Sequence, residues 1–186
     1  MRRTVSAFGI ACALLAPALA AAEAPDPKKW NSAPEGAPEP GTREVPWVSF
    51  VALHTGETLP VFGDAPPRAS FDFLLRCRAT GQVAPIADPL PKLLLRAAKT
   101  LHAPVIEIIA GYRSDKFNEQ LRKKGRQVAD ESFHRAGKAI DWRLRGVPLD
   151  RLYRFLKRVA PGGLGLYRGS NFVHTDLGPK REWRGR

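Results

Sequence analysis

Residues 132–144 read SFHRAGKAIDWRL, and the second half of this stretch has the pattern of a strand in a sheet. From Ala139 onward the side chains alternate, which is typical of a strand with one face in the core and one face open. The residues of the core face are Ile140, Trp142 and Leu144. Asp141 lies on the opposite face, where a carboxylate on an otherwise buried strand needs a partner. A cation supplies one, so the stretch predicts a strand that carries a cation ligand.

Two histidines are candidate partners of this carboxylate: one is near it in the sequence, and the other lies on a second predicted strand. His134 precedes Asp141 by seven residues, and Gly137 between them suits a loop that leads into the strand. His174 lies in FVHTD, residues 172–176, which also alternates as a strand. Two imidazoles and one carboxylate form a common set of catalytic zinc ligands and leave a fourth position for water, whose pKa zinc lowers toward about 7. Taken singly, each fragment is more often a hydrogen-bonded structural group, so the residues alone leave both interpretations open.

The remaining polar candidates have no such neighbours. His54 and His102 are interpreted as ordinary surface or core histidines. Cys77 is the only cysteine after residue 22, so the chain beyond that point can form neither an internal disulfide nor a cysteine-based zinc site. We predict that Cys77 is a small buried side chain.

The rest of the chain predicts a mixture of helices and strands. Strands are expected at 47–53, 59–62, 104–110, 139–144, 164–167 and 171–176, and helices at 71–78, 90–101, 114–123 and 149–159. The first two strands form a hairpin, and so do the last two. Because no regular strand–helix–strand alternation is present, we predict the α+β class. The expected domain is small and single, with a central, mainly antiparallel sheet flanked by helices.

The N-terminal part has a different composition. Arg2 and Arg3 precede an apolar run from about residue 7 to 19, and small residues follow it. This run is shorter than a membrane-spanning helix needs, so we predict a signal peptide at 1–22 and no stable membrane span after its cleavage. Residues 23–47 are rich in proline and alanine and predict a flexible linker. The folded domain then occupies 48–186, and export places it in the periplasm or outside the cell.

The chain is strongly basic, with 30 Lys and Arg against 18 Asp and Glu and a net charge of +12. Loss of the two arginines in residues 1–22 leaves a net charge of +10. A basic protein attracts polyanions. Export argues against nucleic acid and favours an anionic envelope of murein carboxylates, teichoic acids or lipopolysaccharide. A generally solvated basic surface is the other interpretation.

Several motifs, taken in order, resemble one known family. They are Gly111-Tyr112-Arg113-Ser114, Asn118, the stretch from His134 to Asp141, Gly163-Leu164-Gly165-Leu166-Tyr167 and Phe172-Val173-His174-Thr175-Asp176. This series resembles the zinc D-alanyl-D-alanine peptidases, and is most similar to their murein endopeptidase K-like branch. Two further stretches match that branch: His54-Thr55-Gly56-Glu57 and Gly178-Pro179-Lys180-Arg181-Glu182-Trp183. The resemblance therefore covers about residues 48–183.

The resemblance implies a small α+β domain whose antiparallel sheet holds Zn²⁺ through His134, Asp141 and His174. It also implies that Arg113 contacts the carbonyl or carboxylate of the substrate, where a guanidinium stabilises a developing oxyanion. The alternative for Arg113 is a residue at a helix start that pairs with a nearby acid.

The resemblance does not identify the proton acceptor. Several relatives have an acid three residues before the last histidine ligand, and here that position is Asn171, whose amide cannot accept a proton. Asp176 shares a strand face with His174, so it can act as the general base or orient the imidazole of His174. Glu131 is a third candidate.

Three functions follow from these features. The first is a zinc-dependent murein endopeptidase, or less readily a carboxypeptidase, that acts as a monomer on peptidoglycan stem peptides and binds no nucleic acid. The second is a catalytically inactive, zinc-containing peptidoglycan-binding module, which the amide at Asn171 motivates. The third is an exported polyanion-binding protein that depends on charge alone.

Overall fold

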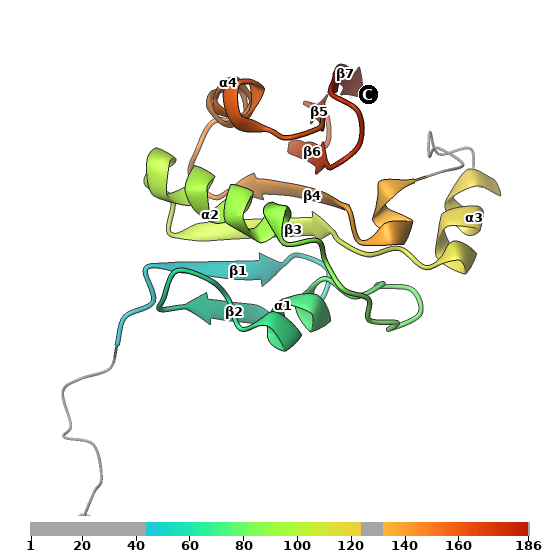
Figure 1. Cartoon of the computed structure of the whole chain (residues 1–186), viewed down its shortest axis with the longest axis horizontal. Coiled ribbons are helices and arrows are strands. Elements are labelled where there is room, and N and C mark those ends of the chain that lie inside the picture. The colour runs from blue at the N-terminus through green and yellow to red at the C-terminus, as the bar shows by residue number, and fades with distance from the viewer. Residues whose placement is uncertain (1–43, 124–131, 186) are drawn as a thin grey trace, which may run out of the picture. The chain divides into compact units, whose positions relative to one another are not determined.

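One sheet organises the chain in a computed structural model that describes residues 44–123 and 132–185 (Figure 1). Within these ranges the strands are β1 (Val48–Ala52), β2 (Thr58–Val61), β3 (Val105–Ala110), β4 (Ala139–Leu144), β5 (Gly163–Tyr167), β6 (Phe172–Asp176) and β7 (Arg181–Gly185). The helices are α1 (Arg68–Leu74), α2 (Pro89–Leu101), α3 (Asp115–Lys123) and α4 (Leu149–Val159), with a short 3₁₀ helix, η2 (Phe133–Ala136). The described residues belong to one compact unit.

The strand order is β2-β1-β3-β4-β6-β5-β7. Four of the pairings are antiparallel, and β1–β3 and β5–β7 are parallel. The predicted small α+β domain with a mainly antiparallel sheet is therefore confirmed. The β1–β2 and β5–β6 hairpins also lie where the sequence predicted them.

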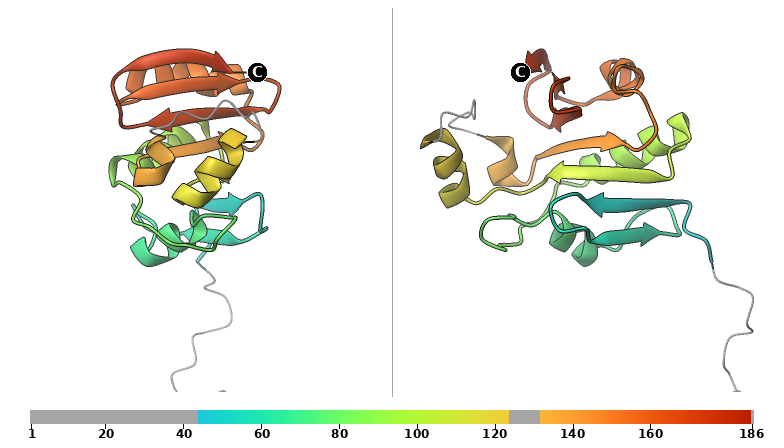
Figure 2. Two further views of the ribbon diagram at one scale, coloured as in Figure 1. Left: turned by 90° about the vertical axis from the view of Figure 1, so that its right-hand side faces the viewer. Right: turned by 180° about the vertical axis from the view of Figure 1, so that it is seen from behind.

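Helices α2 and α4 cover one face of the central strands and contact each other (Figures 1 and 2). Between helices and sheet lies the core, where Trp142, Leu94 and Leu156 are fully buried. Ile140 and Leu144 join this core as the alternation predicted. The opposite face of β4 therefore presents Asp141, away from α2 and α4.

Two elements differ from the prediction. The helix expected at 71–78 begins at Arg68, directly after Pro67, and ends at Leu74. Proline readily starts a helix because its φ is preset and its missing N–H is not needed there. Strand β7 was not predicted, since Arg181–Gly185 is a mostly exposed edge strand without apolar alternation.

Some predictions fall outside the described residues. These are the signal peptide at 1–22, most of the linker at 23–47, and Glu131. Trp47, at the end of the expected linker, is attached to the hairpin: its backbone N–H donates to the Val61 carbonyl at 3.2 Å and its indole Nε1–H to the Gly63 carbonyl at 2.9 Å. Cys77 is buried, as predicted. Among the residues that the structure covers, no helix has the length and apolar character to cross a membrane.

Candidate metal centre

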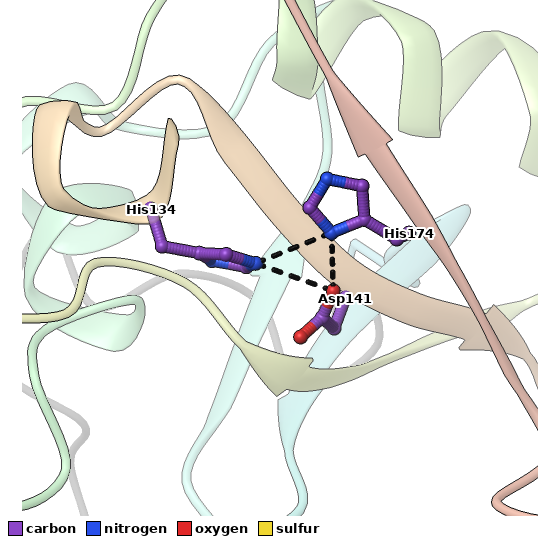
Figure 3. Close-up of side chains that lie close together, drawn as sticks. All are labelled: His134, Asp141 and His174. Atoms are coloured by element: carbon purple, nitrogen blue, oxygen red, sulfur yellow. Dashed lines mark hydrogen bonds and ion pairs between the residues drawn. The ribbon is translucent and has the colours of Figure 1, made fainter. Parts of the chain in front are cut away.

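The structure brings His134, Asp141 and His174 together on the open face of the sheet (Figure 3). Asp141 on β4 and His174 on β6 are direct partners across an antiparallel pair, so their side chains lie next to each other. His134 comes from η2, the turn that leads into β4. Two neighbouring strands and one preceding turn thus supply all three groups.

Gly137 makes the short path from His134 to β4 possible. Its φ is +64°, a left-handed conformation that closes η2 and that glycine adopts without strain. A Cβ at this position would lie 2.0 Å from the carbonyl oxygen of Pro85. Only glycine fits between these segments, and this allows the backbone to turn His134 toward β4.

The distances within the cluster suit a metal ion. Asp141 Oδ1 lies 2.7 Å from His174 Nδ1 and 3.3 Å from His134 Nε2, and the two nitrogens are 3.3 Å apart. Ligands at zinc–nitrogen distances of 2.0–2.1 Å in a tetrahedral site are roughly 3.3 Å from each other. The observed spacing therefore matches three ligands around one ion, and the N, N, O donor set is one that zinc accepts.

His134 is held by a backbone carbonyl. Its Nδ1 lies 2.7 Å from the carbonyl oxygen of Gly111, which can only accept, so Nδ1 carries the proton and Nε2 offers its lone pair to the cluster. His134 is 2% exposed. Burial lowers its pKa, with a smaller contribution from Arg113, although Asp141 acts in the opposite direction. His134 is thus prepared as a neutral ligand.

His174 is oriented by a carboxylate. Its Nε2 lies 2.9 Å from Asp176 Oδ2, so the ring turns Nδ1 toward Asp141 and the cluster. Burial opposes a charge on His174, but hydrogen bonds to Asp141 and Asp176 outweigh it and raise its pKa. In both histidines, one ring nitrogen is bonded to the protein and the other faces the site.

Asp176 is fully buried and strongly bonded. Besides His174, it accepts the backbone N–H of Gly163 at 3.0 Å and of Gly178 at 2.8 Å. The Arg181 guanidinium donates to both of its oxygens, at 3.2 and 2.8 Å. Burial alone would raise the pKa of Asp176, but these donors outweigh burial and bring it far below its usual value. At neutral pH it is a carboxylate whose lone pairs are already occupied.

Arg113 lies beside the cluster and is largely buried. Its Nη2 donates to Asp141 Oδ2 at 2.6 Å, the oxygen that does not approach the histidines. The pairing with a nearby acid that the sequence left open is therefore present, and the acid is a candidate ligand. Burial would raise the pKa of the Asp141 carboxyl, but its interactions with His134 and His174 outweigh burial, and this pKa lies well below its usual value.

The other predicted residues are not members of the metal cluster. Asn171 is exposed in the β5–β6 turn with a φ of +53°. His102 is exposed at the C-terminal end of α2. His54 is also exposed and contacts Arg78.

Trp183 and Arg181 also lie at the site, although no role for either could be predicted from the motif at residues 178–183. The Trp183 ring centroid is 5.2 Å from that of His174. Gly165 lies between them in the sheet, opposite His174 on one side and Trp183 on the other. A Cβ on Gly165 would be 2.6 Å from the indole, so its lack of a side chain lets Trp183 reach the histidine.

An open cleft of about 900 Å³ contains the cluster. Successive strands of the sheet contribute to its lining: Ala52, Ile108, Asp141, His174, Tyr167 and Trp183. Neighbouring strands are about 4.8 Å apart, so the lining crosses the sheet over roughly 24 Å. The metal cluster lies near the middle of this path, with protein surface on both sides.

The chain is similar to known peptidases over this whole region. A family model described as peptidoglycan L,D-endopeptidase MepK matches residues 41–183. A probable peptidoglycan L,D-endopeptidase MepK from Haemophilus influenzae is 36% identical over 146 residues, which cover 74% of this chain and 78% of that protein. Peptidoglycan L,D-endopeptidase MepK from Escherichia coli is 41% identical over 78 residues, 42% of this chain and 43% of that protein. No solved structure gives a significant match. The matched range contains the complete His–Asp–His cluster, and the chain belongs to the peptidase family described as peptidoglycan L,D-endopeptidase MepK.

Proposed function

We propose that the chain is a zinc-dependent murein endopeptidase that hydrolyses peptide cross-links of the bacterial cell wall. The observation that carries this proposal is the cluster of His134, Asp141 and His174 at the middle of an open cleft. The family supports a peptidase that acts on peptidoglycan, and the donor set supports zinc. When bound, zinc would lower the pKa of a coordinated water and polarise the carbonyl of the scissile bond.

The surrounding residues prepare the site for this chemistry. His134 and His174 each keep one ring nitrogen bonded to the protein, so no reorientation is needed when the metal binds. We assign Arg113 to the substrate carbonyl. Only its Nη2 is engaged by Asp141, and a guanidinium has further N–H donors for an oxyanion in the cleft.

For Asp176 we favour the orienting role over that of general base. Its carboxylate already accepts from His174, Arg181 and two backbone N–H groups. A general base near pH 7 needs a pKa close to that pH, and the pKa of Asp176 is displaced in the other direction. Its position behind the ring of His174, away from Nδ1, also suits a group that fixes the ring.

The shape of the cleft favours an endopeptidase over a carboxypeptidase. An endopeptidase binds chain on both sides of the scissile bond, and the cleft here extends past the cluster toward β1 on one side and β7 on the other. The relatives are described as L,D-endopeptidases. We therefore expect the diaminopimelate–diaminopimelate cross-link, which joins an L-centre to a D-centre, to be the preferred bond.

Digestion of purified cross-linked muropeptides tests the proposed function. With zinc present, we expect cross-linked dimers to give monomers whose masses identify the broken bond. A chelator should stop the reaction, and added zinc should restore it. Full cleavage in a chelator-treated, metal-free sample would contradict the proposal. A dimer joined by the D-alanyl–diaminopimelate bond serves as the comparison substrate for bond preference.

Replacing Arg113 with glutamine should reduce kcat by about 10²–10³-fold, as measured for the loss of an oxyanion donor. At saturating zinc, the zinc content should remain near that of the wild type, because the three candidate ligands themselves are unchanged. Steady-state kinetics and metal analysis on the same sample check both parts. Arg145→Gln is the matched control, since Arg145 pairs with Glu107 away from the cluster. Unchanged kcat in Arg113→Gln with weakened zinc binding would instead assign Arg113 to positioning Asp141.

A zinc-containing module without catalysis is the second candidate, and Asn171 favours it. The side chain that replaces the expected acid is an amide in an exposed turn, so it supplies no base. Stoichiometric zinc together with murein binding, but no new products by mass spectrometry, would select this function.

We also propose the domain boundaries and location that the sequence predicted. These are a signal peptide at 1–22, a linker at 23–47 and a peptidase domain at 48–186 in the periplasm or outside the cell. The family's substrate, peptidoglycan, supports an envelope location. N-terminal sequencing of the exported protein tests the cleavage site.

A further inference from the structure

The two helices on the face opposite the metal centre have almost only basic residues among their charged side chains. Helices α2 and α4 have 13 and 11 residues and together contain seven Lys and Arg but a single acid, Asp150. The whole chain has 30 basic and 18 acidic residues, so these helices are far more basic than the chain as a whole. Asp150 pairs with Arg168 and Lys157 pairs with Glu182, which leaves six cations.

The six cations form two arrays, one on the exposed side of each helix. On α2 they are Lys92, Arg96 and Lys99, and on α4 they are Arg151, Arg154 and Arg158. The spacings of three and four residues keep each array on one side of its helix, over about 10.5 Å. None of the six forms an ion pair with an acid of residues 44–123 or 132–185. We call these six residues the basic face.

Two aromatic side chains lie at the edge of the basic face. Trp47 and Phe62 are 37% and 49% exposed. Together with the α2 cations they line a hollow of about 450 Å³, to which Asp64 contributes the only acid. Trp47 is fixed there by its hydrogen bonds to Val61 and Gly63. Exposed aromatic rings beside Lys and Arg are typical of proteins that rest in the headgroup layer of a membrane.

We propose that the basic face, with Trp47 and Phe62, binds the surface of an anionic phospholipid membrane. Each cation near such a surface contributes to binding, and the aromatic rings enter the apolar boundary below the phosphates. A phosphate-bearing polysaccharide would attract the cations equally well, but it offers no apolar layer for the two rings. The lipid surface is therefore the better match.

This mode of binding would orient the cleft. The basic face lies on the outer side of α2 and α4, while Asp141 and His174 lie on the other side of the sheet. A chain bound through the basic face would hold its cleft away from the membrane. If the proposed function holds, the cleft then faces the murein, but membrane binding itself does not depend on catalysis.

Vesicle sedimentation tests the proposal with protein recovered after export, whose N-terminus is read by mass spectrometry so that all variants are compared in the same form. We expect binding to vesicles of phosphatidylglycerol and phosphatidylcholine, weaker but measurable binding at high salt, and little binding to phosphatidylcholine alone. The triple variants Lys92→Gln/Arg96→Gln/Lys99→Gln and Arg151→Gln/Arg154→Gln/Arg158→Gln should each lower the partition coefficient on the order of 100-fold. Trp47→Ala should lower it further at high salt, where the apolar contribution remains.

A charge-matched variant on another helix is the control. Lys116→Gln/Arg122→Gln/Lys123→Gln removes three cations from α3 and should leave most of the vesicle binding. An equal loss in this control would show a general effect of net charge and overturn the proposal. So would unchanged vesicle binding in the α2 and α4 variants, or a loss of binding to a phosphorylated polysaccharide without a loss on vesicles. Zinc content and muropeptide cleavage in solution, measured on the same variants, should equal those of the wild type, which separates this proposal from the proposed function.

Discussion

Replacing His174 with alanine is expected to remove both the bound metal and the peptidase activity. The substitution deletes one of three ligand atoms that lie within 4.8 Å of one another, and leaves the buried Asp141 and His134 to hold the ion alone. Zinc per chain should fall from about one to near zero. Since a metal contributes several kcal/mol to such a reaction, muropeptide cleavage should fall at least about 10³-fold. His134→Ala should have the same effect.

Thermal unfolding supplies a readout that does not depend on activity. Zinc binds the folded wild-type chain, so its addition should raise the Tm, and this shift should be absent in His174→Ala. His102→Asn is the matched control: it removes an exposed histidine at a left-handed position that asparagine tolerates. It should keep the zinc, the Tm shift and the activity. A His174→Ala chain that still bound one zinc and cleaved muropeptides would disprove the ligand assignment.

The parts of the fold that the sequence predicted well are those that local pattern controls. The alternation in 139–144 placed Trp142 in the core and Asp141 on the open face because neighbouring side chains of a strand point to opposite sides. The direction of pairing is not encoded in that alternation, so the parallel β1–β3 and β5–β7 pairs could not be anticipated. Strand β7 was missed because its pairing with β5 stabilises a segment that has no apolar period of its own.

The candidate site also has features that local sequence predicts and features that depend on distant contacts. His134, Asp141 and His174 could be selected because residue type and spacing identify possible zinc ligands, and the structure brings all three together. What surrounds them depends on contacts between distant segments. The partner of His134 is the backbone carbonyl of Gly111. Every residue has such a carbonyl, so the sequence does not reveal which one a histidine contacts. Trp183 reaches His174 only across Gly165, a geometry that requires three strands in register.

The structure bears most strongly on the role of Asp176. From the sequence, its place two residues after His174 allowed either a base or an orienting group. The structure shows its carboxylate bonded to His174 Nε2, to Arg181 and to the backbone N–H groups of Gly163 and Gly178. The choice between the two roles depends on how many donors surround the carboxylate, and these donors come from three different segments of the chain.

Asp176→Asn is expected to lower zinc affinity by about 10–100-fold or more, the range found when a group that orients a metal-binding histidine is removed. The amide keeps the size of the side chain. If its oxygen keeps the bonds to Gly163 and Gly178, its NH₂ faces His174 Nε2–H and Arg181, which are both donors. The ring of His174 can relieve this conflict by moving its proton to Nδ1, the atom that should bind the metal. Zinc titration with a competing chelator measures the loss.

Kinetics at saturating zinc distinguish the two roles of Asp176. If it orients His174, kcat of Asp176→Asn should recover to within about tenfold of the wild type once enough zinc is supplied to fill the site. If it is the general base, kcat should stay down by about 10²–10⁴-fold with zinc fully bound, because an amide cannot accept the proton. Arg181→Gln is the control, since it removes the ion pair with Asp176 but keeps the hydrogen bond that His174 Nε2–H donates to Asp176. Its zinc affinity should fall less than that of Asp176→Asn, because the proton of His174 then stays on Nε2. Equal losses in the two variants would mean that the charge of the Asp176–Arg181 pair, and not the hydrogen bond to His174, maintains the site.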